Sequence, residues 1–103
     1  MEGFVTPPRH KNFLAKKLFG AEGEIIDGSI AYIDPDGGGP DEKHTHEHGH
    51  LFTVIKGRAR IEYGDKTVLV NENESFLVDG KVPHSVWNDT DKQTVMLGIS
   101  VRK

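Results

Sequence analysis

The sequence predicts an all-β domain, and three observations lead to this fold class. From residue 24 onward, short runs of β-forming residues alternate with turn residues, and no window shows the apolar period of a helix. The chain has 103 residues, which is the length of one small domain. Its hydrophobic content of 35% and charged content of 28% are ordinary for a globular protein. Many short, evenly spaced strands favour a sandwich or a barrel.

The first 23 residues predict an arm ahead of this domain. Pro7-Pro8 prevents a helix from running through the start, and the apolar residues that follow, Phe13 among them, need a surface to bury against. We therefore expect residues 1–23 to pack on the barrel or on a partner subunit, and residues 24–103 to form the barrel domain. His10 stands between two basic residues, so we expect a surface histidine, with a lid role or a supporting role beside the site as the alternative.

The domain divides into short candidate strands at residues 24–26, 29–33, 51–56, 59–63, 66–70, 75–78, 85–88 and 94–102. Turn residues separate them at 27–28, 34–40, 56–57, 64–65, 71–73 and 79–80. The Gly64-Asp65 pair predicts a tight hairpin, because glycine followed by a free residue suits a type II′ turn.

Four of the six histidines stand within seven residues, at His44, His46, His48 and His50. In an extended segment residues two apart share a face, so these imidazoles can point the same way. Neutral imidazole is the commonest nitrogen ligand of transition metals. The glycines of residues 37–40 allow the chain to turn and to aim the imidazoles at one point. Spacing alone leaves a second interpretation open, a solvated histidine tract that binds metal loosely.

The histidine run resembles the first motif of the cupins. That motif is a glycine, five residues, His-x-His, three or four residues, a glutamate, six residues and a glycine. These positions are occupied here by Gly38, His44, His46, His50 and Gly57. The chain departs from the family pattern at one of them, because a histidine stands where most members have glutamate.

A later segment resembles the second cupin motif, which ends in a histidine and, after three further residues, an asparagine. His84 and Asn88 match this end. The earlier positions depart, with Asn73, Asp79 and Lys81 where the family often has glycine, proline and glycine. Two motifs in this order, separated by a hairpin, are more specific than a single His-x-His.

The resemblance covers roughly residues 29 to 102 and implies a small single-domain member of the cupin superfamily. The implied fold is a double-stranded β-helix, or jelly-roll, barrel of two antiparallel sheets, here with an N-terminal arm. It also implies one divalent transition metal ion bound inside the barrel by His44, His46, His50 and His84. Fe, Ni, Zn, Cu and Mn all remain open as its identity. His48 falls where the family has no ligand, so we expect it beside the site or in solvent.

The resemblance does not select one reaction. The first hypothesis is a metal-dependent, dioxygenase-like cupin acting on a small oxygen-chelating substrate. The alternatives are a cupin that binds metal or a small, sugar-like ligand without catalysis, a cupin isomerase or lyase, and a metal-free barrel whose histidines only hydrogen-bond one another. No dedicated general base stands out, so no catalytic residue is assigned.

Composition and charge limit the classes of partner and the cellular location that we expect. The net charge is −3 and the basic residues are scattered, which gives no footprint for nucleic acid. No apolar run is long enough to span a bilayer, so no membrane partner is expected. The start has neither a basic n-region nor an apolar h-region, and the chain has no cysteine, which together favour a cytoplasmic protein.

The strand predicted at 51–56 also suggests assembly. His50 lies on one face of this strand, which we take as the interior, while Leu51, Thr53 and Ile55 share the other face. A small barrel has one interior, so the second apolar face of this strand would be exposed to solvent without a partner. We therefore expect a homodimer that binds a small-molecule ligand or substrate.

Overall fold

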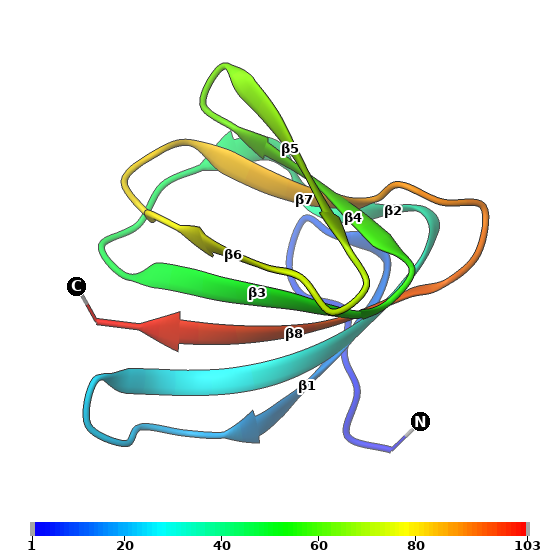
Figure 1. Cartoon of the computed structure of the whole chain (residues 1–103). Helices are drawn as coiled ribbons and strands as arrows, with labels where there is room; N and C mark the ends of the chain where they lie inside the picture. The colour runs from blue at the N-terminus through cyan, green and yellow to red at the C-terminus, as the bar shows by residue number, and fades with distance from the viewer. Residues whose placement is uncertain (1, 103) are drawn as a thin grey trace.

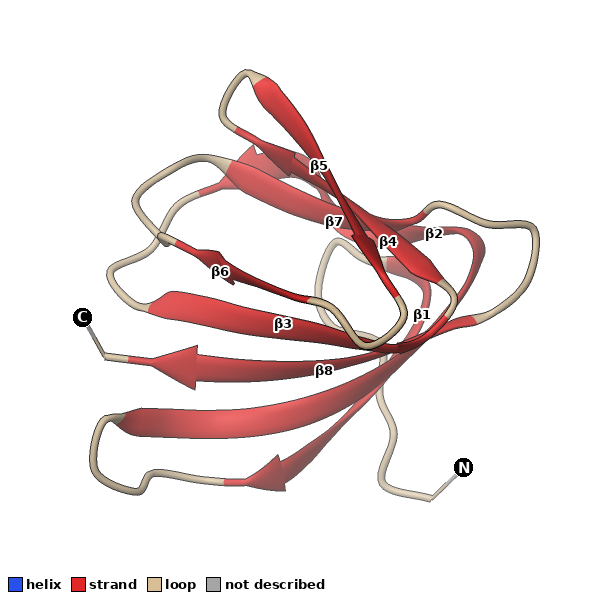
Figure 2. Ribbon diagram, in the orientation of Figure 1, coloured by secondary structure: helices blue, strands red, loops and turns tan. Residues whose placement is uncertain are grey.

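The computed structural model describes residues 2–102, which form strands and loops without a helix (Figures 1 and 2). The strands are β1 (Lys11–Phe19), β2 (Ile25–His44), β3 (Gly49–Lys56), β4 (Arg58–Tyr63), β5 (Lys66–Asn71), β6 (Ser75–Val78), β7 (His84–Asn88) and β8 (Thr94–Val101). The all-β prediction is confirmed. Within the described residues there is consequently no helix long and apolar enough to cross a membrane.

The strands form a nearly closed antiparallel jelly-roll barrel, as the resemblance implied. They pair in the order β5-β4-β7-β2-β8-β3-β6, with β1 on the other side of β2. The long strand β2 belongs to both layers. Its residues up to Ile33 pair with β8, whereas Gly38, Gly39 and His44 pair with β7. Figure 1 shows β2 leaving the layer of β8 and β3 and rising to the layer of β7 and β4.

Two expectations about the first half of the chain are wrong. Residues 11–19 form strand β1 on β2 of the same chain, although the sequence analysis assigned no strand there. The turns expected at 27–28 and 34–40 also lie inside the single strand β2. Neighbouring strands pair with Asp27 and Gly28 in the first segment and with Gly38 and Gly39 in the second, so tertiary pairing overrides the local preference of glycine and proline for turns.

The predicted hairpin is confirmed. Tyr63 pairs with Lys66 across a two-residue turn that joins β4 to β5. Gly64, the first residue of that turn, has a φ of 63°, which glycine adopts without steric cost.

The core lies between the two layers and consists of alternate residues of the strands. Its buried apolar members are Phe13, Ala31, Ile33, Val54, Ala59, Ile61, Val70, Val78, Val86 and Met96. Full burial of a valine or isoleucine side chain contributes about 1.5–3 kcal/mol. Since successive residues of a strand alternate between faces, the pattern that buries Val54 also turns His50 toward the interior.

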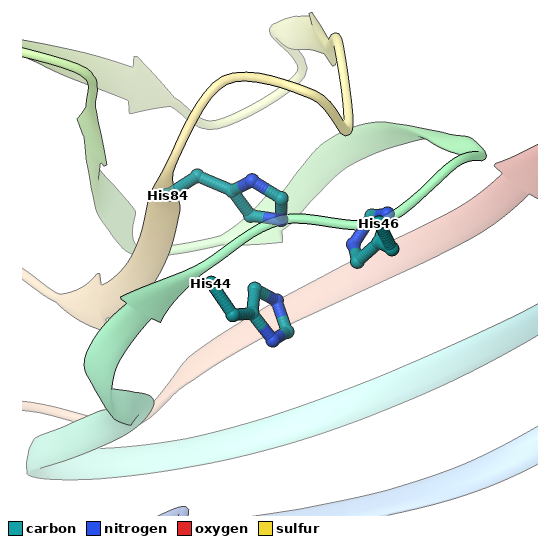
Figure 3. A group of neighbouring side chains, drawn as sticks. All are labelled: His44, His46 and His84. Atoms are coloured by element: carbon teal, nitrogen blue, oxygen red, sulfur yellow. The ribbon is translucent and has the colours of Figure 1, made fainter.

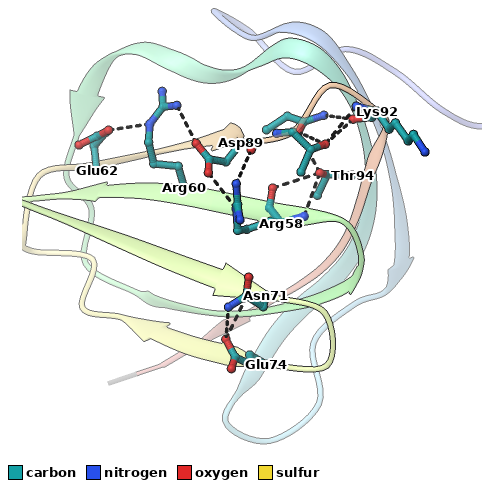
Figure 4. Close-up of polar contacts among 10 residues, drawn as sticks. Arg58, Arg60, Glu62, Asn71, Glu74, Asp89, Lys92 and Thr94 are labelled. Carbon is teal, nitrogen blue, oxygen red and sulfur yellow. Dashed lines mark hydrogen bonds and ion pairs between the residues drawn. The ribbon is translucent and has the colours of Figure 1, made fainter.

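A buried polar cluster fixes the end of β7. The Asn88 amide donates to Ile33 O and to Lys92 O, each at 2.7 Å, while its carbonyl oxygen accepts from Thr90 N at 2.7 Å. Thr94 Oγ1 lies 3.0 Å from the same oxygen (Figure 4). Buried amides that are fully paired in this way rigidify their surroundings, so the strand that begins at the candidate ligand His84 is held at its other end.

Candidate metal centre

Three imidazoles from separate parts of the chain converge at one end of the barrel (Figure 3). His44 is the last residue of β2, His46 lies in the loop that follows, and His84 is the first residue of β7. One ring nitrogen of each lies within 4.8 Å of the others. The ring centroids are 4.7 Å apart for His44 and His84, and 4.8 Å apart for His46 and His84. Folding therefore joins the two sequence motifs into one cluster.

His84 is set up as a nitrogen donor. Its side chain is almost completely buried, with 2% of the residue exposed. Nδ1 lies 2.8 Å from Val82 O, and because a carbonyl only accepts, Nδ1 carries the hydrogen. Nε2 then bears a lone pair, and it is buried without a hydrogen-bond partner. Leaving such a group unpaired costs about 1–3 kcal/mol, and a metal cation at this position would remove that cost. The residues present thus fit an ion.

The same argument fixes His46 and His50. His46 Nδ1 lies 2.7 Å from His48 O, so it donates, and His46 Nε2 carries a lone pair. That atom is 3.1 Å from His50 Nε2, which must then be the protonated nitrogen of the pair. It follows that His50 Nδ1 accepts from the Ser100 hydroxyl at 3.2 Å.

Ser100 allows His50 to change tautomer. To offer Nε2 to a cation, His50 must carry its hydrogen on Nδ1 instead. A serine hydroxyl both donates and accepts, so Ser100 can hold either tautomer after a rotation of its hydrogen. Ser100 is therefore the residue that would orient His50 as a ligand, in the way that outer hydrogen bonds commonly orient metal-binding histidines.

His48 also lies within this cluster. Its ring stacks on His46 with centroids 4.1 Å apart and an angle of 8° between the planes. Ring nitrogens of His46, His48 and His50 form a second group within 4.8 Å. The structure thus brings all four predicted ligands, His44, His46, His50 and His84, into one neighbourhood, with His48 beside them. Which of these nitrogens bind an ion stays a prediction.

The environment keeps three of the candidate ligands, His44, His50 and His84, neutral. Burial, followed by the neighbouring His84 and His46, lowers the pKa of His44 to about 4. Burial and the adjacent His46 lower the pKa of His50 to about 3. The pKa of His84 is also lowered, chiefly by burial. Only neutral imidazole has a free lone pair for a metal, so these three side chains are ready to coordinate at pH 7.

A cavity of about 260 Å³ adjoins the cluster. His44, His50 and His84 form part of its wall, and much of the rest is apolar. The other lining residues are Pro7, His10, Phe13, Ala15, Asp27, Ser29, Ala31, Gly39, Pro40, Phe52, Val86, Met96, Gly98 and Ser100. An apolar cavity with a few convergent polar groups is the usual form of a small-molecule site.

The sequence did not indicate the cavity role of several residues. The expectation of a plain surface histidine at position 10 is wrong, because His10 is half-buried and lines the cavity. The sequence places Asp27 in a turn and Ser29 at the start of a strand and indicates no cavity role for either, yet both line the cavity from β2. The alternation of residues 27, 29 and 31 carried the signal for a strand face, but the Asp27-Gly28 pair favoured a turn.

Comparison with solved structures shows that the fold is shared widely. The Cupin_2 domain of an XRE family transcriptional regulator from Enterobacter cloacae aligns with a TM-score of 0.78 and 15% identity, over 90% of this chain and 99% of that chain. A predicted oxalate decarboxylase from Thermotoga maritima gives 0.82 and 12%, over 97% and 90%. The polyketide cyclase RemF from Streptomyces resistomycificus gives 0.77 and 21%, over 96% and 71%. At these identities the likeness concerns the fold alone.

Sequence comparison identifies the family. A search of curated protein sequences finds no significant match. The Cupin_2 domain family, however, matches residues 29–100, which is most of the chain and includes all the candidate ligands. The jelly-roll barrel and the two motifs agree with this match, and the protein is therefore a member of the Cupin_2 family.

Proposed function

We propose that the protein binds one divalent transition metal ion through His44, His46, His50 and His84 and acts as a metal-dependent oxygenase on a small oxygen-chelating substrate. The observation that carries the metal site is the buried Nε2 of His84. It has no hydrogen-bond partner, and its lone pair is fixed by the bond from Nδ1 to Val82 O. A histidine that served only the core would be expected to pair both nitrogens.

The donor set favours this chemistry. Four neutral imidazoles suit iron, copper, nickel and zinc and leave the charge of the ion uncancelled. When bound, the ion would supply a Lewis acid and, as iron or copper, electron transfer to dioxygen. The chain itself supplies the apolar cavity wall, which excludes water and orients the substrate toward the cluster. In a dioxygenase that cleaves a carbon–carbon bond, both atoms of O₂ enter the substrate and the substrate supplies all the electrons, so no external reductant is required.

The metal is tested first. Protein purified without a histidine tag is stripped with EDTA and titrated with Zn²⁺, Fe²⁺, Cu²⁺ and Ni²⁺, and bound metal is measured by mass spectrometry. We expect one ion per chain. Failure to bind any of the four would exclude the proposal and leave the metal-free barrel.

Catalysis is tested second. Oxygen uptake by the iron- or copper-loaded protein is recorded with a panel of catechols, flavonols and β-diketones. Uptake that depends on the metal and is lost in the stripped protein would support an oxygenase. Saturable binding of these compounds without uptake would support the non-catalytic alternative.

We further propose a homodimer formed through the outer face of the layer that contains β3. Leu51 is flanked there by Leu77 of β6 and Ile99 of β8. Leu77 is 53% exposed and Ile55 is 48% exposed, so this apolar face lacks cover in the single chain. An exposed apolar face of this kind can pack against the same face of a second copy. Sedimentation should show a dimer at micromolar concentration that dissociates in Leu77→Lys, and a monomeric wild-type protein would contradict it.

A further inference from the structure

The N-terminal arm forms one side of the cavity and is fixed to its own barrel. Val5 and Ala15 exchange backbone hydrogen bonds of 2.9 and 2.8 Å, and Arg9 O accepts from Asp41 N at 3.3 Å. The Phe4 ring packs edge-on against Tyr32 with centroids 5.6 Å apart. Residues at both ends of the segment that carries His10 are therefore anchored, which gives its imidazole a defined position.

The His10 ring occupies a closely fitting space between Phe13 and Gly39. A backbone bond of 3.2 Å from His10 N to Pro7 O, together with a φ of 62° at Arg9, turns the chain inward. The imidazole packs edge-on against Phe13, with centroids 4.7 Å apart. On another side it meets Gly39, where a Cβ atom would stand only 2.9 Å from His10 Cγ. Glycine at position 39 thus leaves the space that the ring occupies.

The hydrogen bond of His10 determines what it can offer a ligand. Nδ1 lies 2.8 Å from Pro8 O, so Nδ1 carries the hydrogen and the neutral ring presents only a lone pair at Nε2. Within residues 2–102 no hydrogen-bond partner is found for Nε2. A compound in the cavity can therefore pair with this nitrogen by bringing a donor, such as a hydroxyl group.

The wall of the cavity favours an aromatic compound. Phe13, Phe52, Val86 and Met96 supply its apolar surface. An apolar cavity of about 150 Å³ is enough to admit benzene, and this one measures about 260 Å³. A single ring with one or two oxygen substituents therefore fits between His10 and the histidine cluster.

We infer that His10 is a specificity-determining residue that accepts a hydrogen bond from the hydroxyl group of a small phenolic or enolic compound in the cavity. The inference deepens the proposed function and rests on it for the metal ion bound by the histidine cluster. The cavity and the His10 acceptor exist without that ion. The two proposals can consequently fail separately.

The test compares para-chlorophenol with para-chloroanisole, in which a methyl group replaces the hydroxyl hydrogen. Affinities for both are measured by calorimetry on zinc-loaded and on EDTA-treated full-length protein. His10→Phe keeps a ring against Phe13 but removes the acceptor, and Ser75→Ala, on β6 and outside the cavity wall, serves as the control. Circular dichroism and zinc content verify the fold of each variant.

We expect the wild-type protein to prefer the phenol, and His10→Phe to reduce the ratio of the two affinities about fivefold in both metal states, as the loss of one hydrogen bond predicts. Ser75→Ala should leave the ratio unchanged. An unchanged ratio in His10→Phe, an equal fall in Ser75→Ala, or the absence of saturable phenol binding would overturn the inference. Failure to retain zinc with the His10 effect intact would refute the metal proposal alone.

Discussion

His84 and His10 lie in different parts of the molecule but share one local hydrogen-bonding pattern. In each, Nδ1 donates to the carbonyl two residues earlier, Val82 O or Pro8 O, at 2.8 Å. Both rings therefore present a lone pair at Nε2. They differ in their surroundings, because His84 is buried at the start of β7 among other imidazoles, whereas His10 is half-buried on the arm beside Phe13. The same tautomer thus suits a cation in one place and a hydroxyl group in the other.

The largest expected effect is that of His84→Ala on metal binding. Loss of a buried donor should weaken zinc affinity by at least about 100-fold, more than the loss of an outer hydrogen bond usually costs. Competition with a chromogenic chelator measures the change. His10→Phe should leave zinc affinity unaltered, which is the contrast between the two histidines.

The matched control for this experiment is His48→Ala, which removes a neighbouring imidazole that we do not assign as a ligand. Full zinc occupancy in His84→Ala together with a loss in His48→Ala would show that the local tract binds the ion instead. The comparison between His84 and His10 would then lose its basis.

A smaller effect is expected for Ser100→Ala. Without the hydroxyl, His50 loses the partner that holds its Nδ1 hydrogen when Nε2 faces an ion, so zinc affinity should fall about tenfold. The same chelator competition measures it, with Ser29→Ala as a second cavity serine for control. An affinity equal to that of the wild type would place His50 outside the ligand set.

Gly39→Ala probes the other histidine. The added Cβ would crowd the His10 ring, and the φ of 151° at this position disfavours a side chain. We expect the preference for para-chlorophenol over para-chloroanisole to fall about threefold, which is within the range for one weakened hydrogen bond, while zinc affinity persists. Gly20→Ala, which meets no atom within 4 Å, is the control. Retention of the full preference would mean that Gly39 does not hold His10 in place.

The mildest test uses acid on the metal-free protein. The pKa values of His44 and His50 are lowered to about 4 and about 3, so the unfolded chain takes up protons first as the pH falls below about 6.5. Stability should be fully present above this pH and decline toward pH 4, with Tm falling by about 4–8 °C for each kcal/mol lost. His50→Gln should flatten the decline in a thermal melt. A Tm that is constant from pH 7 to pH 4 would contradict this account.

Much of the barrel could be predicted from the sequence because most strands after residue 50 combine β-forming residues with clear turns. The hairpin at Gly64 and the inward face of His50 are examples, since alternation within one strand determines them locally. The two motifs also indicated that His84 would join the residues near His44. The structure brings them together.

The first half of the chain was harder to predict because its structure depends on partners distant in sequence. Residues 11–19 form a strand only through β2, and Gly38 and Gly39 pair with β7 instead of forming a separate turn. His10 had no local sign of a cavity role. Its position depends on the space at Gly39, some thirty residues later, which no periodicity in the arm reveals.

The position of β8 has a consequence for how this protein is made. β8 is the last of the described strands, yet it lies between β2 and β3 in the sheet. While the chain emerges from the ribosome, β2 and β3 must wait with open edges until residues 94–101 are available, and open edges are sites of wrong pairing. The neighbours of β8 are the two strands on either side of the histidine run: β2 ends in it and β3 begins in it. A nascent chain that has been made only as far as residue 93 therefore contains all the candidate ligands but lacks β8, the strand that joins β2 to β3 and so positions the histidines.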